Sequence, residues 1–426
     1  MNEPPTSASV HPLAQVAGIC LLVLFAFLIW LSAHAGFSSL LSTYAQRSGQ
    51  QAAADAGVNL SQGDPDAHVV RGAVLETNGD LNAAIAEYTW ATSLRPQDYA
   101  LWLNLARARE LNGDVPIAIE AARQALPLAP WYAQPHWQLG NLLVRAGQQE
   151  DGFAQLRLAG ASDPTLWPSI IDLAWQLSRS DVQFVMQAVQ PGTPAAYLSL
   201  AEYFKKRDRV NDAISMLGPA GSSGEDFRRR YVDELLTTKR FADAYAVWGI
   251  GHRSEGDASG PGLTDPGFEQ ESDLDEPGFG WRRPVTEANK VRGTVLSLDT
   301  LNAKAGKSNL RIEFNGDSDP ASPVITQLVI VAPNTHYQLH FVARTEEIVS
   351  GGPPLIGVTD MSTNESLGAS IPFAQPTSNW QNYTLDFNTR SATTAIQIAL
   401  GRESCGKSPC PIYGRLWLDG FSLQKL

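Results

Sequence analysis

Two cysteines near the C-terminus are the residues whose type and spacing point most directly to chemistry. Cys405 and Cys410 are separated by four residues that include Gly406 and Pro409, so a tight loop can bring the sulfur atoms together. A metal site would need about four ligands, and no histidine or further cysteine lies nearby in the sequence. The spacing therefore predicts a disulfide, a bond that persists outside the cytosol.

The sequence motifs of the common catalytic sites are absent. There is no G-x-S-x-G, no H-E-x-x-H, no phosphate loop and no dinucleotide-binding motif. The 7 histidines are scattered along the chain, and the pair Glu346 and Glu347 falls in an expected loop. We therefore predict that the protein is not an enzyme. A glycosidase whose two carboxylates meet only in the folded chain remains an alternative.

Length and charge narrow the class of protein further. A chain of 426 residues is too long for one ordinary hydrophobic core, so two or more domains are expected. The formal net charge is −12, and this acidic balance argues against nonspecific binding to nucleic acid or to anionic lipid.

A 34-residue period organises the region from Pro65 to Pro164. Pro96, Pro130 and Pro164 each follow a helical pattern that a proline cannot continue, and they lie 34 residues apart. Between the prolines, small residues recur where two helices would cross closely, and a glycine recurs in the turn between them. A fixed period of this size is typical of stacked helix-turn-helix units, which must pack together to bury their apolar faces.

The order of these features resembles the tetratricopeptide pattern W-x2-L-G-x2-Y…A-x3-F…P, with Trp102 at the first position and His68 and His136 at its equivalents. Packing explains these two histidines better than catalysis. The resemblance implies an all-α solenoid over residues 65–249, of about six helical pairs, whose first helices line a groove for a protein partner. The candidate groove contacts are polar residues on those first helices: Arg71, Asn104, Arg107, Gln138 and Asn141.

An uncharged apolar run from Val16 to Leu31 precedes the repeats. Its length is sufficient to cross a hydrocarbon core, so we expect a transmembrane helix over residues 13–35 after a disordered N-terminus over 1–12. Residues 36–64 then read as a linker with a possible short helix. The sequence Ala33-His34-Ala35 leaves open a cleaved signal peptide, and a buried core helix is a third alternative.

The orientation of that helix is weakly encoded. No lysine or arginine precedes Arg47, and one basic residue taken literally would place the following chain in the cytoplasm. The expected disulfide favours the opposite orientation. We therefore expect a single-pass protein of the inner (cytoplasmic) membrane with an extracytoplasmic, periplasmic body.

The periodicity of apolar residues changes after a Gly- and Ser-rich linker over residues 250–262. Apolar and polar residues then alternate with period two in short segments separated by turn residues, which indicates an antiparallel β-sandwich. The expected strands are 309–314, 327–331, 337–344, 380–387, 395–400 and 414–423.

Short motifs in residues 263–426 resemble jelly-roll carbohydrate-binding modules of the galactose-binding-like type. They are Gly267-Phe268-Glu269 with Gly280-Trp281, the strand Trp380-Gln-Asn-Tyr383, and the closing strand Leu416-Trp-Leu-Asp-Gly-Phe-Ser-Leu423. The resemblance implies one structural Ca²⁺ held by Glu269 and Asp419, since calcium prefers such hard oxygen ligands.

A sugar site in such a module would need exposed aromatic rings. Trp281, Tyr383 and Tyr413 are the candidates, whereas Trp380 and Trp417 are expected in the core. Sugar binding does not follow from the fold alone.

Together these features predict a membrane-anchored, noncatalytic scaffold. It would bind a protein partner in its tetratricopeptide groove and polysaccharide through its C-terminal jelly roll, in envelope polysaccharide assembly or exopolysaccharide export. The alternatives are a carbohydrate-active enzyme with an unrecognised site, and a purely structural assembly factor that binds no glycan.

Overall fold

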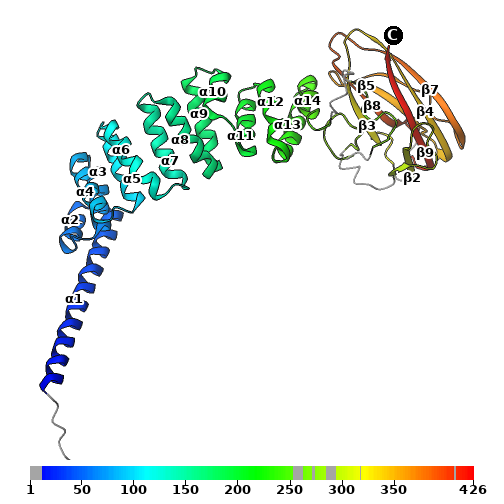
Figure 1. Ribbon diagram of the computed structural model, residues 1–426. Coiled ribbons are helices and arrows are strands. Elements are labelled where there is room, and N and C mark those ends of the chain that lie inside the picture. The colour runs from blue at the N-terminus through cyan, green and yellow to red at the C-terminus, as the bar shows by residue number, and fades with distance from the viewer. Residues whose placement is uncertain (1–11, 253–261, 271–273, 285–293, 317, 407–408) are drawn as a thin grey trace, which may run out of the picture. The chain divides into compact units, whose positions relative to one another are not determined.

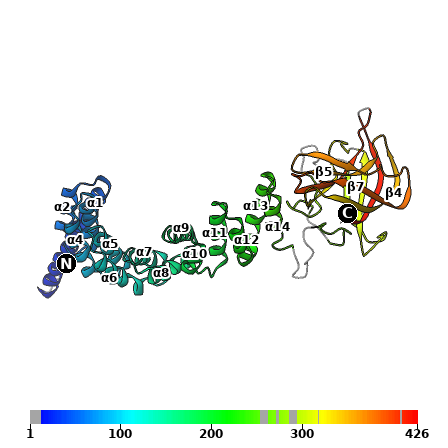
Figure 2. The ribbon, with the colours of Figure 1, turned by 90° about the horizontal axis from the view of Figure 1, so that it is seen from above.

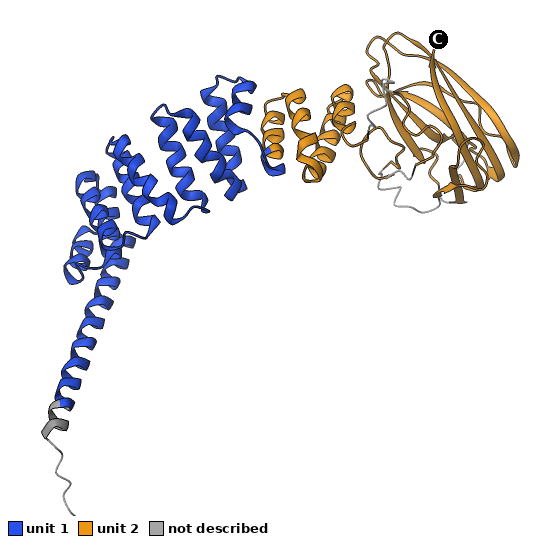
Figure 3. Ribbon diagram, in the orientation of Figure 1, with its two compact units in different colours: residues 1–196 blue, residues 197–426 orange. Residues whose placement is uncertain are grey.

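The computed structural model describes residues 12–252, 262–270, 274–284, 294–316, 318–406 and 409–426. The N-terminal residues expected to be disordered, and most of the expected linker at 250–262, lie outside these ranges. The chain divides into two compact units, residues 1–196 and residues 197–426 (Figures 1 and 3).

The first unit is helical. Its elements are α1 (Pro12–Ser48), α2 (Gln51–Leu60), α3 (Pro65–Thr77), α4 (Leu81–Leu94), α5 (Tyr99–Leu111), α6 (Val115–Ala125), α7 (Ala133–Arg145), α8 (Gln149–Ser162), α9 (Trp167–Leu177) and α10 (Val182–Val189). From α3 onwards, successive helices pair as hairpins. Asp64, Asp80 and Asp98 cap the N-termini of α3, α4 and α5, respectively, by accepting backbone N–H bonds.

Close contact between the two helices of a hairpin requires the small residues that the repeat pattern places there. A Cβ atom on Gly140 would lie 2.9 Å from the Gly152 carbonyl oxygen, and a Cβ on Gly72 would lie 2.9 Å from the Tyr88 ring. The turn glycine of the first hairpin, Gly79, has φ +87°, a conformation that side chains disfavour.

The segment expected to be a linker, residues 36–64, is instead mostly helical. Helix α1 continues without interruption to Ser48, and α2 packs against both α1 and α3. Ser38, Ser42 and Ala45 are buried in that contact, and the Ser38 hydroxyl donates to the Gly57 carbonyl at 2.9 Å. The linker prediction was wrong because small polar residues, which read as a flexible segment, serve here to let helices approach closely.

The second unit begins with more helices of the same kind. They are α11 (Pro194–Lys205), which starts in the first unit, α12 (Val210–Ala220), α13 (Glu225–Thr237) and α14 (Phe241–Trp248). Residues 65–248, all of which the structure describes, thus hold the α-helices α3 to α14, and contacts join the pairs α3–α4, α5–α6, α7–α8, α9–α10 and α13–α14.

Two antiparallel sheets complete the second unit (Figure 2). Their strands are β1 (Thr294–Asp299), β2 (Asn309–Gly316), β3 (Ile325–Ile330), β4 (His336–Ser350), β5 (Pro354–Asp360), β6 (Glu365–Ala369), β7 (Ser378–Asn388), β8 (Ala395–Arg402) and β9 (Ile412–Lys425). The strand orders are β1-β2-β9-β4-β7 and β3-β8-β5-β6. Alternate residues of both sheets, such as Ile312, Leu339, Ile398 and Leu416, meet in one apolar core, as their period-two pattern predicts.

Candidate functional site

One contact recurs through the first helices of the repeats. A ring nitrogen of His68, Trp102 and His136 lies 2.9, 2.9 and 3.0 Å from the carbonyl oxygen of the residue six positions earlier. These three residues are spaced by the 34-residue period. Both histidines therefore hold the entry of a helix against the preceding turn, as their repeat position indicates.

The candidate groove residue Arg71 is engaged within the protein. Its guanidinium forms ion pairs with Asp55 of α2 at 2.7 Å and with Glu87 of α4 at 3.3 Å, and so joins three helices. Asn104 is half-buried on α5.

Arg107 takes part in a ladder of ion pairs between neighbouring first helices. Arg107 on α5 pairs with Glu76 on α3, and Arg145 on α7 pairs with Glu110 on α5. The two glutamates are equivalent in the repeat. Glu76 also accepts a hydrogen bond from the Tyr88 hydroxyl, and burial together with that carboxylate raises the pKa of Tyr88 to about 12.

The two amide candidates are also bonded internally. Gln138 on α7 donates to the carbonyl oxygen of Leu103 on α5 at 2.9 Å, and Asn141 donates to the Trp137 carbonyl at 2.8 Å. Four of the five predicted groove residues therefore have intramolecular partners, and three of these four join neighbouring helices. A partner that used them would have to compete with the contacts that hold the repeats together.

An exposed aromatic group on the first unit was missed by the sequence reasoning. Trp131 is 86% exposed and the neighbouring Tyr132 is 60% exposed, just before α7. The Tyr132 ring lies 5.6 Å from that of Tyr99 at the start of α5. The repeat itself carries a signal, because the equivalent positions 34 residues earlier are the polar residues Gln97 and Asp98.

Two of the three candidate sugar-stacking rings lie inside the β-sheet region. Trp281 is 1% exposed, stacks on Phe268 at 4.9 Å and donates its ring N–H to the Asp265 carbonyl. Tyr383 is 5% exposed and stacks on Phe341 at 5.4 Å. Their burial counts against a stacking role for either ring.

The third candidate ring, Tyr413, is 53% exposed and lines a cavity of about 480 Å³. Other lining residues are Val349, Gly351, Pro411 and the two cysteines, Cys405 and Cys410, which the structure joins in a disulfide.

Arg402 lies beneath this loop. Its guanidinium donates to the carbonyl oxygens of Gly352 and Cys410 at 3.1 and 2.9 Å, and to the Ser350 hydroxyl at 2.8 Å.

Trp417 is 3% exposed, as the sequence predicts for a core residue, but it lies outside the core between the two sheets. Its neighbours Leu416 and Leu418 point into that core, so the indole lies on the outer face of the five-stranded sheet. It is buried there because the Arg344 guanidinium lies 4.7 Å above the ring, while its N–H donates to Asp299 at 2.7 Å. Trp380, also expected in the core, is partly exposed.

Glu269 and Asp419, the predicted calcium ligands, lie close together beside the loop that follows β1. Asp419 is fully buried and accepts N–H bonds from Lys304 and Ala305 at 3.0 and 3.1 Å, while Glu269 accepts from the Lys307 N–H at 2.8 Å. Burial raises the pKa of Asp419, and the neighbouring Glu269 charge raises it further.

A buried amide completes a set of oxygen donors here. Asn309 is fully buried and its side-chain oxygen has no hydrogen-bond partner. Asn309 and Asp419 flank the Leu310–Leu418 pair on adjoining strands. Two carboxylates and an unpaired amide oxygen are the ligand types that Ca²⁺ prefers, so these residues fit the predicted ion. Among the described residues no group of three His, Cys, Asp or Glu side chains gathers around a common point.

Comparison with known proteins bears mainly on the helical repeats. No family model matches the chain. Over 89 residues, or 21% of the chain, it is 32% identical to the TPR repeat-containing thioredoxin TTL4 of Arabidopsis thaliana, and this match covers only 13% of that protein.

Solved structures with local similarity to the chain include three proteins at low sequence identity. MamA of Desulfovibrio magneticus is 17% identical with a TM-score of 0.33, covering 37% of this chain and 92% of that one. PilF of Pseudomonas aeruginosa is 16% identical with a TM-score of 0.33, covering 50% and 98%. YrrB, described as a TPR protein with an unusual peptide-binding site, is 16% identical with a TM-score of 0.28, covering 44% and 82%. From its 34-residue period, its helical pairs and the 89-residue match to a TPR repeat-containing protein, the chain has a tetratricopeptide-like helical region followed by a C-terminal β-sheet region.

Proposed function

We propose that this protein is a noncatalytic scaffold that holds a protein partner on the first-helix face of its repeats. The observation that carries the proposal is the regular series of helical pairs α3–α4, α5–α6 and α7–α8 in the first unit, whose first helices α3, α5 and α7 place equivalent residues side by side. Because most of the polar candidates on that face have internal partners, we expect apolar contact and the half-buried Asn104 to contribute more to binding than ion pairs.

Site-specific photo-cross-linking in cells tests this proposal. A photoreactive residue at Asn104, on the first helix α5, should give a discrete adduct, whereas one at the exposed Gln124, on the second helix α6, should not. Identical adduct patterns from the two positions, or none from Asn104, would contradict a partner on this face.

We propose that α1 anchors the protein in the inner membrane, with an extracytoplasmic body. Its span from Ile19 to Ser48 is long and apolar enough to cross a bilayer, and it carries no lysine, arginine, aspartate or glutamate before Arg47. A signal sequence passes the same test. Mass spectrometry of the mature N-terminus distinguishes the two, since cleavage after Ala35 would remove the apolar run.

For the β-sheet region we propose glycan binding, in envelope polysaccharide assembly or export. Support comes from the galactose-binding-like motifs and from the cavity beside Tyr413. A glycan array with the full chain, Tyr413→Ala and the control Tyr132→Ala tests it. Binding that is lost only in the first variant supports a sugar site at this cavity. A folded chain that binds no glycan would leave a purely structural assembly factor.

The arrangement of the adjacent carboxylates supports the absence of catalysis, which stays part of the proposal. Asp419 is fully buried and accepts backbone N–H bonds from Lys304 and Ala305, so this carboxylate is packed against the chain rather than open to a substrate, whereas Glu269 is exposed. Hydrolysis of polysaccharide that disappears in Asp419→Asn would instead favour the carbohydrate-active enzyme.

A further inference from the structure

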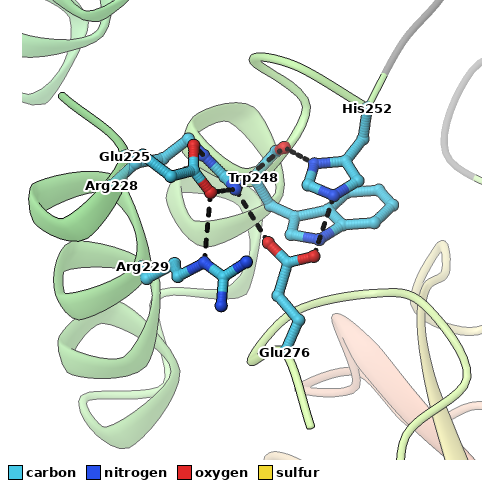
Figure 4. Close-up of polar contacts among 6 residues, drawn as sticks. All are labelled: Glu225, Arg228, Arg229, Trp248, His252 and Glu276. Carbon is cyan, nitrogen blue, oxygen red and sulfur yellow. Dashed lines mark hydrogen bonds and ion pairs between the residues drawn. The ribbon is translucent and has the colours of Figure 1, made fainter. Parts of the chain in front are cut away.

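Within the second unit, the last helical pair meets the segment that leads into the β-sheets (Figure 4). We call residues 274–284 the leading segment. Glu225 and Arg228 lie on α13, Trp248 ends α14, and Glu276 belongs to the leading segment. These residues come from parts of the sequence that were expected to belong to two separate domains.

A buried arginine connects the two parts. The Arg228 side chain is 6% exposed, and its guanidinium donates to Glu225 at 2.5 Å and to Glu276 at 2.7 Å. Burial alone would lower the pKa of Arg228, but its bonds to the two carboxylates outweigh that effect and raise it. A charge taken out of water in this way needs its partners, so loss of Glu276 would leave Arg228 with one carboxylate instead of two.

His252, four residues after Trp248, holds the other side of the same carboxylate. One ring nitrogen lies 3.0 Å from Glu276 and the other lies 2.9 Å from the Trp248 carbonyl oxygen. The imidazole also stacks on the Trp248 ring, with centroids 4.5 Å apart and planes 12° from parallel. Glu276 is thus bonded to both Arg228 and His252.

Apolar contacts surround this polar cluster. Phe279 of the leading segment is buried, with its ring 4.9 Å from that of Tyr245 and 5.8 Å from that of Trp248. Gly278 has φ +150°, and a Cβ atom at that position would overlap the Trp248 ring. The close approach of backbone to indole therefore requires glycine here.

We infer that the leading segment is the C-terminal cap of the helical repeats. Glu276 links α13 and α14 to this segment, so that the last helical pair and the leading segment unfold locally as one cooperative unit. A stack of helical pairs leaves an apolar face at each end, and that face needs a cap. Trp248 and Tyr245 belong to that face at the last pair, and Phe279 covers them. Motion of the β-sheet region is consequently transmitted to the last repeat.

Hydrogen exchange of the full chain, resolved by peptide, tests this inference. In the wild type, peptides from α14 and from the leading segment should converge on one opening free energy as denaturant is added, because they open together. Glu276→Gln keeps the shape of the side chain but removes its charge. It should accelerate exchange in both segments by about tenfold or more, and leave α5 to α8 unchanged.

Glu234→Gln is the matched control, because Glu234 lies on α13, the helix that carries Arg228, and pairs with Lys205 instead. Acceleration confined to the leading segment, or an equal effect of the control, would overturn the inference. If Glu276→Gln fails to fold, the wild-type series alone still decides, since separate opening free energies for α14 and the leading segment would exclude a common body.

Discussion

At the scale of single residues, Arg402 shows how backbone carbonyl oxygens and a hydroxyl can hold a buried charge: among the described residues no carboxylate is bonded to its guanidinium. Its hydrogen bonds go to carbonyl oxygens and to the Ser350 hydroxyl, and burial lowers its pKa. One side chain thereby ties the end of β8 to two loops, one of which carries the disulfide.

Replacing this guanidinium should destabilise the β-sheet region. Arg402→Met leaves several buried carbonyl oxygens without donors, and we expect a loss of about 3 kcal/mol in the free energy of unfolding. Chemical denaturation measures it. Arg390→Met is the control, because the Arg390 side chain is half-exposed and forms an ion pair with Glu365, which is exposed to a similar extent. Equal losses in the two variants would contradict a special role for the buried site.

Glu225 predicts a specific response to acid. Its hydrogen bond to Arg228 lowers the pKa of the carboxyl from 4.5 to about 2. A lowered folded-state pKa contributes stability above the ordinary pKa, and this contribution is lost as pH falls toward the folded value. Between about pH 5 and about pH 3 the wild type should therefore lose more stability than Glu225→Gln. Parallel losses in the two proteins would show that the pair does not stabilise the fold.

Asp419 has the opposite sign. Because its pKa is raised in the folded state, its ionised form costs stability, and that cost grows as pH rises through the folded pKa. A bound Ca²⁺ would offset it. Thermal unfolding of the full chain should shift upward with calcium and back with a chelator, and Asp419→Asn should lose the response. A wild-type unfolding midpoint that does not change with calcium would contradict the predicted calcium site.

At the scale of elements, the sequence predicted where the helical pairs lie but not the side-chain contacts between neighbouring pairs. The 34-residue period located the hairpins because prolines and small residues are tied to local geometry. The intramolecular partners of Arg107 and Gln138 were not predicted, because Glu76 and Leu103 lie 31 and 35 residues away and only the packing of one repeat on the next brings them together.

The β-strands were predicted for the same local reason, and the errors again concern neighbours in space. Period-two alternation placed Leu416 and Leu418 in the core, and by the same parity Trp417 had to face outward. The strand motif around Trp417 predicted burial, and the ring is buried, but on the outer face of its sheet. Its actual cover, Arg344, comes from a strand that the alternation alone does not pair with β9.

The contact of α1 with α2 and α3 can be tested by overfilling it. Ser38 is fully buried, so Ser38→Leu should force the helices apart at a cost of about 1–3 kcal/mol. Limited proteolysis between α1 and α2, around Gly49, should then become faster. Ser39→Leu, on the exposed side of the same helix, should leave the cleavage rate unchanged; equal rates in both variants would argue that this contact is not needed.

At the scale of the whole molecule, the boundary between the two compact units does not fall at the predicted linker over residues 250–262. Residues 197–426 form one compact unit, in which the leading segment packs on α14. A fragment that begins at residue 197 should therefore unfold at a higher denaturant concentration than one that begins at 263, since the shorter fragment exposes Phe279. Indistinguishable midpoints would mean that the β-sheet region is stable without the helices.

Helix α1 has a mechanical consequence. It runs unbroken from the apolar segment to the buried contacts of Ser38, Ser42 and Ala45, with no slack chain between. A pull on the first repeats would reach the apolar segment as a bending moment, in the way that a load on a lever reaches its fulcrum. A tether of the same length would instead absorb that pull by straightening.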